Sequence, residues 1–237
     1  MGCLKALITC ALIASLAQAI SMGGDALEDR QESCAQIHLL VARGSTEPPG
    51  DGQLGSLAAR IIRAHQGATQ EAIDYPALLN PYSTSVRAGT AAVLNQLTAY
   101  VRRCPNSMVV LLGYSQGAQI IGDALCGGDA AGAGPVTPPM DRNISDHVTA
   151  IVWYGDPRNV AGKPFDKGTA TMNGIYGRPP AQSCDRFSNS MASYCDRGDP
   201  YCAQGANVGV HLTYPSRYDI AAATFVNQKL ASPTVKF

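Results

Sequence analysis

The stretch Val109-Val-Leu-Leu-Gly-Tyr-Ser-Gln-Gly-Ala118 decides the fold of this chain. Its aliphatic start is typical of a buried strand, and the apolar, turn-free residues 118–125 predict a helix. Between them stands Gly113-Tyr-Ser-Gln-Gly117. Strand, G-x-S-x-G and helix in this order are typical of a nucleophile elbow, in which Ser115 is held out at the carboxyl end of a sheet. The alternative is a glycine-flanked serine in an ordinary turn.

The elbow has physical requirements that the sequence meets. The serine sits on a strained turn, so the residues two before and two after it must lack side chains for strand and helix to pass closely. The helix N-terminus beneath the serine offers free N–H groups and a positive dipole end to a developing oxyanion. The pattern therefore favours a nucleophilic Ser115.

The start of the chain predicts export. Residues 1–19 contain one early lysine, an apolar run over 6–16 and the sequence Ala17-Gln18-Ala19. This is typical of a signal peptide with a small-x-small cleavage site, and the run is too short to span a membrane. We expect 20–32 to be a loose N-terminal extension and the mature protein to be secreted.

Composition indicates one compact domain over 33–237 with no charge bias. The chain balances 18 Lys and Arg against 18 Asp and Glu, so nothing suggests nucleic acid or an anionic membrane as a partner. Two of its eight cysteines lie in the predicted signal peptide. The even remainder favours three disulfides in an exported chain, with the pairing left open. No C-x2-C pair occurs, so we expect no metal site. The remaining cysteines are Cys34, Cys104, Cys126, Cys184, Cys195 and Cys202.

Strand and helix patterns alternate along the chain. We expect strands at 36–42, 71–75, 109–113, 148–154 and 191–194. Helical spacing covers 54–62, 86–101 and 220–230 in addition to 118–125, whereas 127–142 and 159–185 read as irregular. This alternation predicts a three-layer α/β domain with a parallel sheet covered on both faces.

A nucleophilic serine requires a base. In α/β-hydrolases the chain order is serine, acid, histidine. Of the four histidines, His38 and His65 precede Ser115. His147 follows it but lies in the connection before the strand at 148–154. His211 follows the last predicted strand, where the order rule places the base, so we expect His211 to serve.

The acid has two candidates. Asp156 ends the strand at 148–154, and Asp199 lies between Cys195 and Cys202, where a disulfide would hold its loop. Both precede a proline, so each is also a typical turn residue. Local reasoning leaves the two open.

Several motifs together resemble a known family. C-P-x4-V-x-L-G-Y-S-Q-G at 104–117 and C-D-x-G-D-P-Y-C at 195–202, followed by His211, are similar to the cutinase and acetylxylan esterase family, carbohydrate esterase family five. The segments A-R-G-S-T-E at 42–47, A-L-C-G-G-D at 124–129 and Y-G-D-P-R at 154–158 also fit. The resemblance runs from about Ser33 to the C-terminus.

The resemblance implies an α/β-hydrolase-type fold with about five strands and no lid. The reaction that it implies needs no cofactor. It implies Ser115 as nucleophile, Asp199 as acid and His211 as base. The Gln116 N–H and Ser45 would form the oxyanion hole. It also implies three disulfides, namely Cys34–Cys104, Cys126–Cys184 and Cys195–Cys202.

The sequence contains features of both acetylxylan esterases and cutinases, which differ in their substrates. Leu112 stands where cutinases usually carry Gly or Ser, and the segments at 117–120, 155–159 and 199–202 look more like acetylxylan esterases. The segments at 43–47 and 210–212 are cutinase-like. We therefore expect a secreted, monomeric serine esterase that deacetylates xylan in the plant cell wall. The alternatives are a cutinase acting on cutin and a non-catalytic secreted binding protein on the same fold.

One modification site is predicted. Asn143-Ile144-Ser145 is an N-x-S sequon beside the Pro/Gly-rich loop, and we expect a glycan on Asn143 in a eukaryotic secretory route.

Overall fold

One parallel sheet forms the centre of the protein. The computed structural model describes residues 34–132 and 134–232, so the predicted signal peptide and N-terminal extension lie outside the described residues. The sheet has the strand order β2-β1-β3-β4-β6-β5. Its strands are β1 (Ile37–Ala42), β2 (Thr69–Ala72), β3 (Met108–Tyr114), β4 (Val148–Tyr154), β5 (Asp166–Gly168) and β6 (Met191–Cys195).

The predicted sheet is confirmed with two differences. The short strand β5 pairs with the edge of β6 inside a region expected to be irregular, which makes six strands instead of about five. The outer strand β2 begins at Thr69 and ends at Ala72, earlier than the expected 71–75. Both differences fall on edge strands, where partial exposure removes the alternating apolar pattern that marks a strand in a sequence.

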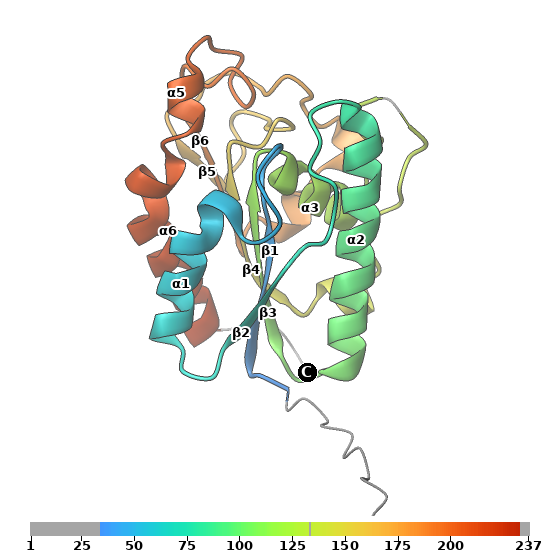
Figure 1. Cartoon of the computed structure of the whole chain (residues 1–237), viewed down its shortest axis with the longest axis vertical. Coiled ribbons are helices and arrows are strands. Elements are labelled where there is room, and N and C mark those ends of the chain that lie inside the picture. The colour runs from blue at the N-terminus through green and yellow to red at the C-terminus, as the bar shows by residue number, and fades with distance from the viewer. Residues whose placement is uncertain (1–33, 133, 233–237) are drawn as a thin grey trace, which may run out of the picture. The chain divides into compact units, whose positions relative to one another are not determined.

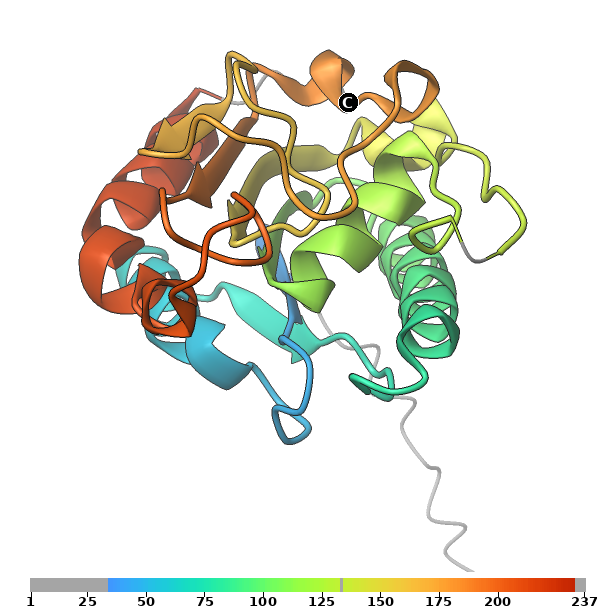
Figure 2. The same cartoon turned by 90° about the horizontal axis from the view of Figure 1, so that it is seen from above.

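Helices cover both faces of the sheet (Figure 1). α1 (Gly55–Ala64) and α6 (Tyr214–Ala231) lie against one face, while α2 (Tyr82–Arg103) and α3 (Gln116–Cys126) lie against the other, as the view from above also shows (Figure 2). Shorter turns complete the described chain: η1 (Gly52–Leu54), α4 (Arg142–Ser145), η2 (Pro180–Gln182), η3 (Asp185–Phe187) and α5 (Val208–His211). None of the helices in 34–132 and 134–232 is long and apolar enough to cross a membrane.

The central strands are apolar on both faces because each face packs on helices. Leu39 and Val41 of β1 pack toward α1 and α6, whereas Leu40 between them packs toward α2 and α3. All seven residues of β3 and of β4 are buried. Burying each large aliphatic side chain contributes about 1.5–3 kcal/mol, so the two apolar layers hold the carboxyl ends of these strands in a fixed arrangement.

The last helix is longer than its apolar spacing predicts. α6 begins at Tyr214, with Pro215 in its first turn, where a missing N–H has no helical partner to lose. Ile220, which marked the expected start of the helix, is 72% exposed. The buried face of α6 is carried instead by residues such as Tyr214, Ala222 and Val226.

The three disulfides that the resemblance implied are formed. Cys34–Cys104 joins the segment before β1 to the end of α2, and Cys126–Cys184 joins the end of α3 to the turn before η3. Cys195–Cys202 closes a short loop directly after β6. The last of these lies at the carboxyl edge of the sheet, beside the candidate site.

Candidate active site

Ser115 occupies the sharp turn between β3 and α3. Its backbone has φ 55° and ψ −118°, a conformation that a residue with a side chain adopts only under strain. Its N–H donates to the last carbonyl of β4 at 2.8 Å, which fastens the turn to the sheet. The strained backbone expected of a nucleophile elbow is therefore present at Ser115.

The two flanking glycines are needed for the reason that the sequence suggested. A Cβ on Gly113 would lie 2.7 Å from the Ala118 Cα and 2.8 Å from the Ala118 N, too close for any side chain. A Cβ on Gly117 would run into the backbone at the end of β1. The strand before the serine and the helix after it can approach this closely only with glycine at both positions.

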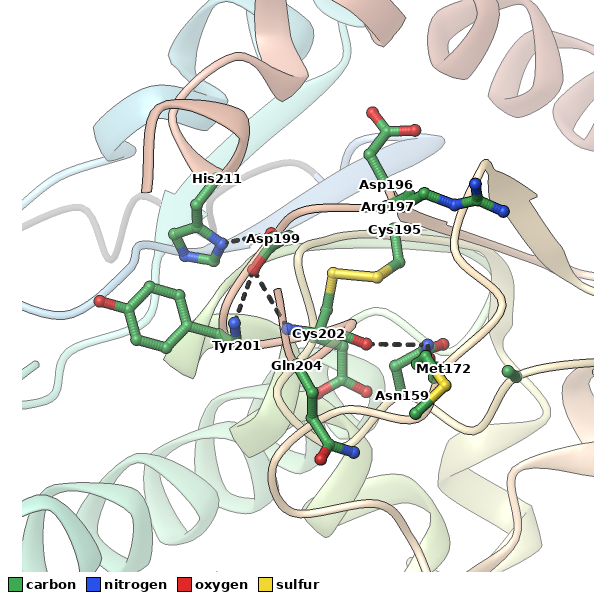
Figure 3. Close-up of a disulfide and its surroundings, with 12 residues drawn as sticks. Asn159, Met172, Cys195, Asp196, Arg197, Asp199, Tyr201, Cys202, Gln204 and His211 are labelled. Carbon is green, nitrogen blue, oxygen red and sulfur yellow. Dashed lines mark hydrogen bonds and ion pairs between the residues drawn. A yellow bond between two sulfur atoms is a disulfide. The ribbon is translucent and has the colours of Figure 1, made fainter. Parts of the chain in front are cut away.

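His211 and Asp199 meet beside this turn. His211 ends the short helix α5, and its Nδ1 lies 2.7 Å from Asp199 Oδ2. Figure 3 shows the Asp199 side chain pointing from the Cys195–Cys202 loop toward the imidazole. A carboxylate on Nδ1 leaves Nε2 as the nitrogen that is free to accept a proton.

Asp199 is fully buried and fully hydrogen-bonded. Its Oδ1 accepts the N–H groups of Tyr201 at 2.7 Å and of Cys202 at 3.1 Å (Figure 3). Its Oδ2 accepts from His211 and from the Tyr214 hydroxyl at 2.8 Å. Burial acts to raise the pKa of Asp199, but these hydrogen bonds and the charge of His211 hold that pKa below its ordinary value. The carboxylate therefore stays ionised.

The other acid candidate has a different environment. Asp156 follows β4, and its Oδ1 accepts the Arg158 N–H at 2.9 Å, as a turn-forming aspartate does. Burial raises the pKa of Asp156, the opposite direction from Asp199. The geometry thus separates two residues that the sequence left open, and His211 lies on Asp199.

The remaining histidines lie away from the serine. His147 directly precedes β4, at the amino edge of the sheet, whereas Ser115 follows β3 at the carboxyl edge. His38 stacks on Tyr100 with ring centroids 3.7 Å apart. His65 hydrogen-bonds Asn227 at 2.9 Å. Only His211 shares the carboxyl edge with Ser115 among these four.

The loop carrying Ser45 is held by two charged side chains. The buried Arg43 donates to the carbonyls of Glu47 at 2.9 Å and Tyr75 at 2.6 Å. Glu47 in turn accepts the N–H groups of Gly44 at 2.6 Å and of residue 53 at 2.9 Å. These contacts close the loop over 43–47 after β1, so Ser45 is presented at the same edge of the sheet as Ser115.

Gln116 supplies the helix end beside the serine. It is the first residue of α3, where a backbone N–H has no acceptor within its own helix. Its buried side chain is fixed, since Oε1 accepts from Ser85 at 2.9 Å and Nε2 donates to the Leu78 carbonyl at 2.9 Å. The N–H is thereby held at the positive end of the α3 dipole.

One cleft with a volume of about 340 Å³ lies at this edge of the sheet, and Ser45, Ser115 and His211 all belong to its walls. Apolar side chains form part of the wall as well, and four of them are strongly exposed: Leu79, Ile175, Val208 and Leu212.

Several contributors to the site were not found by sequence reasoning. Tyr214 hydrogen-bonds Asp199, and the Tyr114 hydroxyl donates to the His211 carbonyl at 3.1 Å. Gly155 has φ 63°, and a Cβ there would lie 2.7 Å from the imidazole Cε1. Of these, Tyr114 and Gly155 belong to motifs already marked in the sequence, at 113–117 and 154–158, but their contacts with His211 depend on tertiary packing. Tyr214 lies in no marked segment and left no signal.

The predicted glycosylation site lies elsewhere. Asn143 is exposed on α4, in the connection that leads to the amino end of β4.

Comparisons with known proteins agree with this architecture. A family model described as cutinase matches residues 33–230. Cutinase 11 of Verticillium dahliae is 40% identical, covering 91% of this chain and 75% of that protein. An acetylxylan esterase of Hypocrea jecorina is 38% identical, covering 92% and 74%. The solved catalytic core domain of acetyl xylan esterase from Trichoderma reesei matches with a TM-score of 0.78 and 38% identity, over 83% of this chain and 99% of that one. The strained serine turn, the fold and these relatives lead to one conclusion: the chain belongs to the cutinase family of carboxylic ester hydrolases.

Proposed function

We propose that this protein is a secreted serine esterase in which Ser115, His211 and Asp199 form the catalytic triad. The observation that carries the proposal is the 2.7 Å hydrogen bond between His211 Nδ1 and Asp199 Oδ2, in the cleft that Ser115 also lines. The ionised, buried Asp199 fixes the imidazole tautomer and stabilises the imidazolium that forms during the reaction.

The chemistry follows from these roles. His211 Nε2 takes the hydroxyl proton of Ser115 as the serine oxygen attacks the ester carbonyl carbon. The resulting oxyanion is stabilised by the Gln116 N–H at the start of α3 and by Ser45 in the loop after β1. His211 then gives its proton to the departing alcohol. Water hydrolyses the acyl-enzyme by the same route, with His211 as base, and releases the carboxylic acid.

For the substrate, we infer acetyl esters of xylan. The cleft wall includes hydroxyl, amide and carboxylate side chains that could contact a polysaccharide, among them Thr46, Glu47, Gln53 and Tyr201. Two bulky rings, Tyr82 and Tyr176, also stand in its wall with centroids 5.7 Å apart and reduce the room for a long acyl chain. The names of the relatives, which include acetylxylan esterases, support the same inference.

The second candidate is hydrolysis of cutin. One observation favours it: Leu79, Val208 and Leu212 of the cleft wall are 58%, 49% and 55% exposed, an apolar border suited to a polyester. Each CH₂ that such a border buries would add about 0.8 kcal/mol, nearly fourfold in rate if realised in the transition state. The two candidates therefore differ in how the rate changes with acyl length.

The test combines one variant with a substrate series. Ser115→Ala should lower kcat on p-nitrophenyl acetate by about 10⁴- to 10⁶-fold while the circular dichroism spectrum and melting temperature stay near those of the wild type. A folded variant that retains a tenth of the activity would remove Ser115 from the mechanism. A wild-type protein without any esterase activity would favour the non-catalytic binding alternative.

In the series, kcat/KM should peak at acetyl or propionyl esters, and acetylated xylan should release acetate. A peak at butyryl or longer, with cutin monomers released and xylan untouched, would assign the protein to cutin hydrolysis instead. Secretion and a glycan on Asn143 belong to the same proposal. They predict a secreted protein whose mass falls on enzymatic deglycosylation.

A further inference from the structure

Tyr214 contacts the candidate acid directly from the start of α6. Its side chain is completely buried, and its hydroxyl lies 2.8 Å from Asp199 Oδ2. This is the same carboxylate oxygen that His211 Nδ1 approaches at 2.7 Å. Two groups from two different helices therefore converge on one oxygen atom.

The surroundings of the hydroxyl decide which way its single proton points. The Asp196 N–H donates to the Tyr214 oxygen at 3.0 Å, so this contact uses an acceptor lone pair. Cys202 Sγ lies 3.2 Å away, but it is bonded to Cys195 and carries no hydrogen. A disulfide sulfur is also a far weaker acceptor than a carboxylate. The Tyr214 proton is therefore donated to Asp199.

The donor is kept both protonated and in place. Burial, followed by the negative charge of Asp199, raises the pKa of Tyr214 above its ordinary value. The ring stacks against Tyr154 with centroids 5.8 Å apart and against Tyr218 at 6.2 Å. Because the ring is completely buried against these neighbours and the backbone begins a long helix, the hydroxyl has no alternative position without repacking the core.

We propose that Tyr214 is a positioning residue for the triad: its hydroxyl holds the Asp199 carboxylate toward His211 and withdraws part of its charge, which sets the pH below which the imidazole becomes protonated. The inference rests on the proposed triad. A carboxylate that shares its charge with a second donor attracts a proton on the imidazole less strongly. Removing the hydroxyl therefore favours the imidazolium and moves the loss of activity to higher pH.

Other groups face His211 without sharing this role. Tyr114 donates to the His211 carbonyl from β3, and the Tyr201 ring lies 4.5 Å from the imidazole centroid. Glu47 lines the same cleft as His211, with its carboxylate held by backbone N–H groups, and Asp156 follows Gly155 with its carboxylate on the Arg158 N–H. Among the described residues, no side chain other than those of Tyr214 and His211 hydrogen-bonds the Asp199 carboxylate.

The test is the pH profile of Tyr214→Phe, with Tyr154→Phe as the matched control. Tyr154 is also fully buried, belongs to the same stack and donates to an aspartate, Asp219, at 3.0 Å. Each variant thus loses one buried tyrosine-to-aspartate hydrogen bond, and Tyr214→Phe also leaves the Asp196 N–H without its acceptor. The measurements are kcat/KM on p-nitrophenyl acetate from about pH 4 to about pH 9, and the melting temperature.

For Tyr214→Phe we expect the acid limb of kcat/KM to move up by about 0.5–1 pH unit and kcat at the optimum to fall about tenfold. Tyr154→Phe should also lower the melting temperature, though by less because no backbone N–H loses its acceptor, and it should leave the acid limb where it is. An unmoved limb in Tyr214→Phe would overturn the proposal and leave Tyr214 a packing residue, whatever its loss of stability.

A second measurement covers the case in which Tyr214→Phe does not fold. Placing 3-fluorotyrosine at position 214 keeps the shape of the ring and makes the hydroxyl a stronger donor, so the acid limb should move to lower pH. A limb that stays or rises would overturn the inference. An error in the proposed triad would give a different result from an error in the role of Tyr214. If the triad is wrong, Ser115→Ala will retain activity, whatever the two Tyr214 variants do.

Discussion

Gly117 packs directly against the carbonyl of Ala42, so closely that a Cβ on the glycine would overlap that oxygen. The first turn of α3 therefore rests on the end of β1, the neighbour of β3 in the sheet. Through this contact β1 fixes the position of the serine turn relative to the sheet and its distance from the loop that carries Ser45.

Gly117→Ala should disrupt both the site and the fold. The clash is with backbone atoms, which cannot rotate away as a side chain can. We therefore expect a loss of about 1–3 kcal/mol or more in the free energy of unfolding and a loss of most activity. Gly55→Ala is the control, since its Cβ would meet only the Asp51 Cβ at 3.7 Å and its backbone is already helical. That variant should gain about 0.4–1 kcal/mol. Urea denaturation of both proteins measures the difference, and equal stabilities would contradict the steric argument.

Asp199→Asn should remove most activity without unfolding the protein. An amide on His211 favours the wrong imidazole tautomer, and we expect kcat to fall by roughly 10⁴-fold. Asp156→Asn is the comparison, because Asp156 is also buried but holds a turn through Arg158 N–H. Its effect on kcat should be far smaller. Steady-state kinetics of the two purified variants decides between them, and a reversed order would make Asp156 the acid.

The central part of the fold was accessible from the sequence because its signals are local. A strand buried on both faces, such as β3, must be continuously apolar, and the elbow needs glycines at fixed spacing. β5 gave no such signal, since Asp166-Lys-Gly carries no apolar residue and is held by backbone pairing to β6. Ile220 misled for the opposite reason, as an apolar side chain that faces solvent.

The candidate site was predictable in part for a related reason. Ser115 carries a motif, and His211 follows from chain order, but the choice between Asp156 and Asp199 depends on which carboxylate reaches His211. That is a tertiary relationship. The helix at 118–125 was expected to be apolar, yet Asp123 within it is 1% exposed and paired with Arg158 at 3.0 Å. A buried ion pair needs a partner from a distant segment, which a local pattern does not reveal.

The disulfides should separate into one that supports the site and others that support the fold. Chain-entropy arguments give about 2.4 kcal/mol for the seven-residue separation of Cys195–Cys202 and about 4.4 kcal/mol for the 70-residue separation of Cys34–Cys104. Replacing the first pair by serines should therefore lower kcat strongly and the melting temperature only slightly, because the Cys202 N–H holds Asp199. Replacing the second pair should lower the melting temperature strongly and kcat only slightly. Thiol titration first verifies the bonds, and unchanged kcat in the first variant would refute the division.

His38 should make the protein less stable in mild acid. Burial, and then the charge of Arg103, lowers the pKa of His38 from 6.5 to about 4. Between these two values the unfolded chain binds a proton that the folded protein does not, so stability falls as the pH drops from 6.5 toward 4. His38→Phe, which keeps the stacking on Tyr100, should flatten this part of the profile of melting temperature against pH. His65→Gln serves as the control, and an equal flattening there would contradict the assignment.

Tyr214 also ties the candidate site to the order in which the chain is made. The serine turn is made by β3 and α3 and fastened by the last carbonyl of β4, but the base, the acid and the tyrosine that contacts the acid all come later, from residues 199–214. Of these residues, Tyr214 begins α6, which packs beside α1, the first α-helix of the described chain. A growing chain therefore carries its nucleophile long before it can use it. On the proposed mechanism, the polypeptide has no esterase activity until nearly the whole domain has been made and its last helix has docked on its first.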